Sequence, residues 1–137
     1  NDEENTCLIS ILVGMSEVLR ALGMYDSAIK SCKDALRLID LRIESTSSLA
    51  ARVIECIAST HRDRFEYEKA LRCYKECLKQ QEEAEGGNSI NGARILHDMA
   101  LIYCLKGETE KASNGLQESL RIFQHQIGFG FSIDQEK

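Results

Sequence analysis

Six cysteines and three histidines are the side chains of this sequence that could hold a metal ion or form disulfides. Cys73 and Cys77, four residues apart, could supply half of a zinc site. The candidate partners for such a site are His61, His97 and His125. No second close cysteine pair and no Cys-x-x-Cys unit accompanies them. We therefore interpret the cysteines as small, soft side chains at helix interfaces in a reducing compartment, and we predict neither a metal site nor a cofactor.

Motifs for catalysis are not evident in the sequence either. It offers no Ser-His-Asp arrangement, no glycine-rich loop for phosphate and no carboxylate pair in a context typical of an active site. An all-helical enzyme would need a buried polar constellation, and the sequence indicates none. We therefore predict a protein that is not an enzyme, and we assign no catalytic residue.

The overall composition argues against several other classes of protein. The chain has 137 residues, of which 43% are hydrophobic and 28% charged, so it has enough apolar material for one compact domain or a short solenoid. No apolar run approaches the ~20 residues of a membrane span. The net charge of −5, without a basic stripe, argues against nucleic-acid binding. The acidic residues 1–4 argue against a signal peptide, so we expect a cytoplasmic protein. Because residue 1 is not Met, we expect a piece of a longer protein.

One segment recurs three times along the chain at a constant interval. The copies are residues 22–29, 64–71 and 106–113. Their alanines, Ala28, Ala70 and Ala112, are spaced 42 residues apart. A constant period of this size is typical of stacked copies of one supersecondary unit. Since stacked repeats form extended surfaces, the pattern favours a function in binding.

Apolar residues at helical spacing predict two helices in each period, and the absence of Pro favours helices throughout. The apolar positions that mark the six helices lie within residues 8–22, 28–39, 49–61, 67–78, 95–103 and 112–123, and the second helix should run to about residue 43. Gly23 and Gly128 are expected to end helices, and the segments 45–48 and 86–89 to separate the repeats. These signals predict an all-α protein of three antiparallel helix pairs, with repeats at about 6–44, 47–86 and 89–127.

Aligned on the repeated alanine, the three copies resemble the tetratricopeptide repeat, a helix–turn–helix unit. The resemblance implies a right-handed superhelical solenoid in which residues 1–137 form one domain, with small side chains where the two helices of a unit cross. The structural repeat positions are Ser16, Ala28, Ala58, Ala70, Ala100 and Ala112. The 42-residue period is similar to that of the kinesin light chain subgroup, although His97 and Asp98 stand where that subgroup has paired Asn residues.

The same resemblance places the first helix of each pair along a concave groove. Arg20 and Arg62 are equivalent in successive repeats, and so are Arg52 and Arg94. Four guanidinium groups on one face could bind the carboxylates of an extended peptide, or they could pair with acidic neighbours such as Asp63. The candidate binding residues are Arg20, Arg52, Glu55, Arg62, Arg94, His97, Asp98 and Leu101, and Val13 is also expected to face the groove.

We interpret the chain as a non-enzymatic protein–protein interaction module or scaffold, whose groove binds an acidic peptide or a helix of a partner. The alternative is a ligand-sensing regulatory array attached to an effector domain outside this chain. Residues 128–137 could cap the last helix, begin a further repeat or pack on another copy, so oligomerisation through the C-terminal end stays open. We expect neither a nucleic-acid nor a membrane partner.

Overall fold

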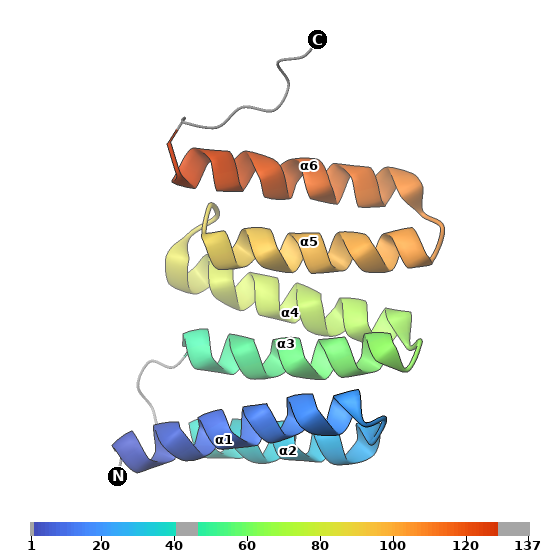
Figure 1. Cartoon of the computed structure of the whole chain (residues 1–137). Coiled ribbons are helices and arrows are strands. Elements are labelled where there is room, and N and C mark those ends of the chain that lie inside the picture. The colour runs from blue at the N-terminus through green and yellow to red at the C-terminus, as the bar shows by residue number, and fades with distance from the viewer. Residues whose placement is uncertain (1, 41–46, 129–137) are drawn as a thin grey trace. The chain divides into compact units, whose positions relative to one another are not determined.

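The chain forms six α-helices and, within the parts that the structure describes, no strand. A computed structural model describes residues 2–40 and 47–128. The helices are α1 (Asp2–Ala21), α2 (Tyr25–Asp40), α3 (Ser47–Asp63), α4 (Tyr67–Glu85), α5 (Ile90–Leu105) and α6 (Thr109–Gln126). Figure 1 shows each of the pairs α1–α2 and α5–α6 joined by a short turn and running antiparallel. The predicted all-α class is confirmed.

Two predicted helix boundaries differ from the observed ones. α1 begins at Asp2, before the expected repeat start at residue 6, because acidic side chains in a first turn are stabilised by the helix dipole. α3 begins at Ser47, inside a serine-rich segment that was expected to be a break, and Ser is well tolerated where a helix starts. The predicted end of the second helix near residue 43 falls in 41–46, outside the described residues.

Residues 1–77 and 78–137 form two compact units, and the boundary between them falls within α4. The first unit contains α1, α2, α3 and the beginning of α4 as far as Cys77. The second contains the end of α4 with α5 and α6. The expectation of a single domain over residues 1–137 stays a prediction.

The core of the first unit is an apolar cluster that joins α2 to both α1 and α3. Its buried members are Ile9 and Val13 of α1, Cys32, Ala35 and Ile39 of α2, and Val53 and Ile57 of α3. The beginning of α4 is tied to α3 by two hydrogen bonds. The Cys77 thiol donates to the Ala51 carbonyl at 3.1 Å, and the hydroxyls of Ser59 and Tyr74 lie 3.0 Å apart. Three helices thus converge on α3.

In the second unit, α5 and α6 pack closely where both helices carry small residues. A Cβ added at Gly115 of α6 would lie 3.3 Å from the Cβ of Ala100. One turn further along α6, the Ser119 hydroxyl donates to the Ala93 carbonyl at 2.7 Å. Before α5, the Ser89 hydroxyl accepts a hydrogen bond from the Gly92 N–H at 2.9 Å, the N-cap arrangement that satisfies an otherwise free donor of a first turn.

All six small residues at the structural repeat positions are buried. They are Ser16, Ala28, Ala58, Ala70, Ala100 and Ala112, of which Ala112 has the largest exposed fraction, 6%. Burial of such small side chains is what close helix approach requires, because a larger side chain would separate the helix axes.

The expectation that Val13 faces a groove is wrong, since only 2% of it is exposed. α1 is apolar on two faces, and the apolar pattern alone does not say which face its neighbours cover. The unit buries the face that carries Ile9, Val13 and Ser16. The other face, which includes Ile11 and Met15, is exposed to solvent.

The turn within each repeat requires a left-handed backbone at one position. Gly23 and Gly107 adopt φ values of 80° and 83°, and the equivalent residue of the middle repeat is Phe65, at 66°. A side chain in this region is strained, whereas Gly is not. Phe65 is 78% exposed and makes an edge contact with Tyr67, with 6.3 Å between the ring centroids.

We predict that Ala100→Phe lowers the free energy of unfolding by about 1–3 kcal/mol, because the ring has no space between α5 and α6 opposite Gly115. Urea denaturation measures this change. The matched control is Ala21→Phe, at an exposed alanine of α1, which should leave the midpoint nearly unchanged. Equal effects of the two substitutions would contradict the close approach.

We predict that Gly107→Ala destabilises the chain by about 1–2 kcal/mol through backbone strain alone, since an added Cβ would meet no atom within 4 Å. The control, Gly87→Ala, has the same open surroundings without a positive φ, and it should be neutral or slightly stabilising. Comparing the melting temperatures of the two variants separates the effect of backbone strain from the effect of steric contact.

Candidate protein-binding surfaces

Two of the predicted groove arginines share one carboxylate in the first unit. Arg20 Nη1 lies 3.4 Å from Asp63 Oδ2, and Arg62 Nε lies 3.3 Å from Asp63 Oδ1. Arg20 extends from α1, whereas Arg62 and Asp63 end α3, so the first contact also links the two helices. Partly exposed pairs of this kind contribute only about 0–1 kcal/mol each. The two guanidinium groups are nevertheless engaged within the protein itself.

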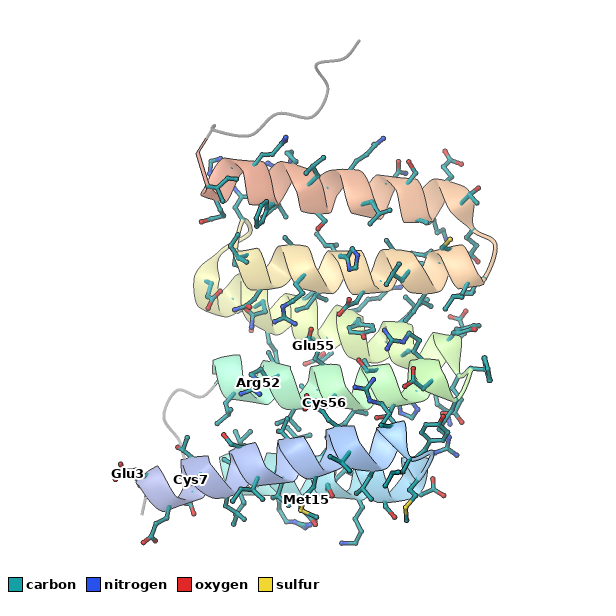
Figure 2. All side chains as sticks on the ribbon, in the orientation of Figure 1. Glu3, Cys7, Met15, Arg52, Glu55 and Cys56 are labelled. Atoms are coloured by element: carbon teal, nitrogen blue, oxygen red, sulfur yellow. The ribbon has the colours of Figure 1, made fainter. Side chains whose placement is uncertain are left out.

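The next two predicted residues, Arg52 and Glu55, lie near the beginning and middle of α3 (Figure 2). The Arg52 side chain is exposed, and the described part of the chain offers it no hydrogen bond or ion pair. Glu55 is half-buried. Arg52 therefore presents a solvated cation that an incoming carboxylate could reach without first displacing an internal partner.

The predicted residues of the second unit follow one face of α5. Arg94 Nη2 donates to Asn91 Oδ1 at 3.0 Å, and His97 Nδ1 lies 3.4 Å from Asp98 Oδ1. Arg94 and His97 are both exposed, and 41% of Leu101, one turn further along α5, is exposed as well. The structure therefore places these residues on one accessible helix face.

Beside this face, α5 and α6 enclose a hollow of about 420 Å³. It is lined by Ile90, Ala93, Arg94 and His97 of α5 and by Leu116, Ser119, Leu120 and Phe123 of α6. The surface of this hollow is mostly apolar, and Arg94 and His97 lie on its α5 side. A volume of this size lies within the usual range for a ligand pocket, about 300–1,000 Å³.

A second hollow of about 390 Å³ lies further along the same two helices and shares Leu116 and Leu120 with the first. Sequence reasoning assigned no binding role to these α6 residues. The signal was available in the apolar spacing of Leu116, Leu120 and Phe123, but spacing alone does not show that no neighbouring helix covers them. In the structure, 42% of Leu116 and 43% of Phe123 are exposed.

The thiols of Cys32 and Cys56 form the most perturbed titratable pair of the first unit. The Cys56 thiol donates to the Cys32 sulfur and lowers the pKa of Cys32 to about 7; burial opposes this shift, and hydrogen bonding with Ser16 adds to it. The pKa of Cys56 is correspondingly raised, first because its proton is held by Cys32 and second because it is buried. The pair lies at the α2–α3 contact, since Cys56 packs on the cluster that contains Cys32.

The other histidines and cysteines that could take part in catalysis or metal binding lie in separate places. His61 Nδ1 lies 2.7 Å from Glu66 Oε1, and this contact lowers the pKa of the Glu66 carboxyl. The six cysteines are free thiols. Among the described residues, no group of three His, Cys, Asp or Glu side chains is arranged to hold a metal ion. No helix in residues 2–40 or 47–128 has the length and apolar character needed to cross a bilayer.

Comparison with known protein families identifies the family of this chain. The model of the tetratricopeptide repeat family matches residues 49–125, more than half of the chain, so the chain belongs to the tetratricopeptide repeat family. The family resemblance drawn from the repeated segments is confirmed. The similarity of the period to that of the kinesin light chain subgroup stays a prediction.

Two solved structures share the fold. The crystal structure of BtubC (BKLC) from P. vanneervenii superposes with a TM-score of 0.82 at 20% identity, over 93% of this chain and 50% of that one. The present chain thus spans half the length of BtubC. The crystal structure of the TPR domain of Arabidopsis FLU superposes with a TM-score of 0.72 at 13% identity, over 88% of this chain and 98% of that domain. No curated protein matches the sequence.

We predict that the thiolate absorbance of the folded chain rises in a step near pH 7, and that Cys32→Ser removes this step whereas Cys7→Ser retains it. Because the pKa of Cys32 is lower in the folded chain than in the unfolded one, its thiolate contributes to stability above the ordinary thiol pKa. That contribution is lost as the pH falls through about 7. An unchanged ultraviolet titration of Cys32→Ser would contradict this assignment.

Proposed function

We propose that the chain is a non-enzymatic protein–protein interaction module whose hollow between α5 and α6 receives a helix or an extended peptide of a partner. Tetratricopeptide repeats generally bind proteins, and the family membership supports that coarse function. The observation that carries the finer proposal is the hollow itself, whose surface is mostly apolar and whose lining includes Arg94 and His97.

The lining defines the chemistry of the ligand. Leu116, Leu120 and Phe123 offer apolar surface for a large aliphatic or aromatic side chain. Arg94, which donates to the Asn91 side chain, presents a planar donor fork that can bind a carboxylate with two hydrogen bonds. A segment with an apolar side chain beside an acidic one therefore fits the hollow.

Arg52 extends the proposal to the first unit. It is an exposed cation on a first helix, at the position equivalent to Arg94, and an acidic segment could bind it in the same way. Arg20 and Arg62 fit this role less well, because Asp63 already neutralises part of their charge. We therefore assign recognition to Arg52, which is exposed, and to Arg94, which lines the hollow, ahead of the pair Arg20 and Arg62.

A peptide display selection on the chain tests the proposal. We expect enrichment of segments in which an apolar residue lies beside an acidic one, and at least an approximately tenfold loss of affinity for them, about 1.4 kcal/mol, with Arg94→Glu. Arg72→Glu, at an exposed position of α4, makes the same change of charge outside the hollow and serves as the matched control. Equal losses of affinity with both variants would show that binding depends only on the net charge of the chain. No enrichment at all would overturn the proposal.

A further inference from the structure

The first helix of the chain has a face that its own unit does not cover. Five large apolar side chains follow one stripe of α1 at alternating spacings of three and four residues, which is the spacing of a helix-packing seam. They are Leu8, Ile11, Met15, Val18 and Leu22, and their exposed fractions lie between 42% and 67%. Figure 2 shows Met15 on the side of α1 that faces away from α3.

The middle of the equivalent stripe is buried in each later first helix. Ile11 corresponds to Val53 and Ile95, which are 0% and 1% exposed, against 58% for Ile11 itself. Met15 corresponds to Ile57 and Met99, which are 9% and 7% exposed, against 47%. The residues at these two levels are large and apolar in all three repeats, so the difference in exposure comes from the presence or absence of a covering helix.

Within the first unit, the structure shows which helix covers this stripe. Val53 and Ile57 of α3 belong to the same buried cluster as Cys32, Ala35 and Ile39 of α2. The second helix of one repeat thus covers the first helix of the next. A helix with α2-like spacing of small and apolar residues is therefore the complement of the open face of α1.

The last second helix of the chain, α6, has this spacing and is open. The positions equivalent to Cys32, Ala35 and Ile39 are Leu116, Ser119 and Phe123. Leu116 and Phe123 are 42% and 43% exposed, whereas the three α2 residues are at most 6% exposed. The two open faces of the chain are the two halves of a junction that α2 and α3 already form inside it.

We propose that copies of this chain associate head to tail, with the open face of α1 of one copy docked in the hollow between α5 and α6 of another. This inference rests on the proposed function, because it names a second copy of the chain as the partner that occupies the hollow. The geometry expected for the contact is that of the α2–α3 junction of the first unit.

Residue sizes at the two faces are matched. At the internal junction Leu49 packs against the cluster that contains Ile39, whereas at the open faces the equivalent residues are the smaller Cys7 and the larger Phe123. A hollow of about 440 Å³ lined by Cys7, Leu8 and Ile11 offers space for the larger ring. Gly14 stands where α3 has Cys56, and a Cβ added there would meet no atom within 4 Å.

The charges beside the two faces are opposite. Glu3 and Glu4 line the hollow on α1, while the guanidinium group of Arg94 lines the hollow between α5 and α6. Pairing of these groups orients the two copies and accelerates their encounter, and it weakens as salt is added.

A head-to-tail contact uses two different surfaces, so every copy retains one free face after it binds. Such contacts grow into rings or open chains rather than stopping at a symmetric dimer. Association should therefore increase steadily with protein concentration and should shift to smaller species at high salt.

Sedimentation velocity of the full chain and of two single variants tests the arrangement. Met15→Glu places a charge on the α1 face, and Phe123→Glu places one on the α6 face; both positions are exposed, so circular dichroism should show unchanged helix content. We expect each variant alone to be monomeric at concentrations where the unaltered chain associates. An equimolar mixture should form a one-to-one dimer, because each variant retains the face that the other has lost. Leu105→Glu, at an exposed position of α5 outside both faces, is the matched control and should associate like the unaltered chain.

Other outcomes would overturn the proposal. A dimer of Met15→Glu alone would place the contact between two α6 faces, and a dimer of Phe123→Glu alone would place it between two α1 faces. Association only after removal of residues 129–137 would mean that this segment occupies the hollow in the full chain. If the unaltered chain is monomeric at all concentrations but still loses its selected peptides with Arg94→Glu, self-association fails while the proposed function stands.

Discussion

The close approach of helices at small residues is the constraint on which the rest of the structure depends. At Ala100 and Gly115 the two helices of the second unit come so near that a Cβ added at Gly115 would lie 3.3 Å from that of Ala100. Equivalent small residues, Ser16 and Ala58, are buried in the first unit. The hairpins α1–α2 and α5–α6 bury the helix faces that carry these small residues, while apolar side chains on another face of α1 and of α6 stay exposed.

One apolar face of α1 is exposed at positions whose equivalents in α3 are buried. Val53 and Ile57 are buried against α2, whereas Ile11 and Met15, at equivalent positions, have no such cover. Exposed apolar stripes of this length are uncommon on isolated domains and mark surfaces of interaction. The hollow between α5 and α6 and the open face of α1 are therefore candidate interaction surfaces, as the predicted groove arginines are.

Electrostatics further divides the predicted groove into engaged and available groups. Arg20 and Arg62 are held by the single carboxylate of Asp63, so a ligand must compete with it. Arg52 is exposed, and Arg94, which donates to the Asn91 side chain, lines the α5–α6 hollow. The two pairs of equivalent arginines thus differ in the neighbours that they meet.

The period, the helical class and the family could be predicted from the sequence, because helical spacing and the recurrence of Ala28, Ala70 and Ala112 are local properties of the chain. It also identified Arg94 and His97, which the structure places at the α5–α6 hollow. It could not decide which apolar face of α1 is buried, and Val13 was assigned to the wrong one. Exposure at Met15, sharing of Asp63 by two arginines, and the hollow between α5 and α6 were decided by tertiary structure alone. Each depends on which neighbouring helix covers a given face. The local sequence around a residue does not show which helix that will be.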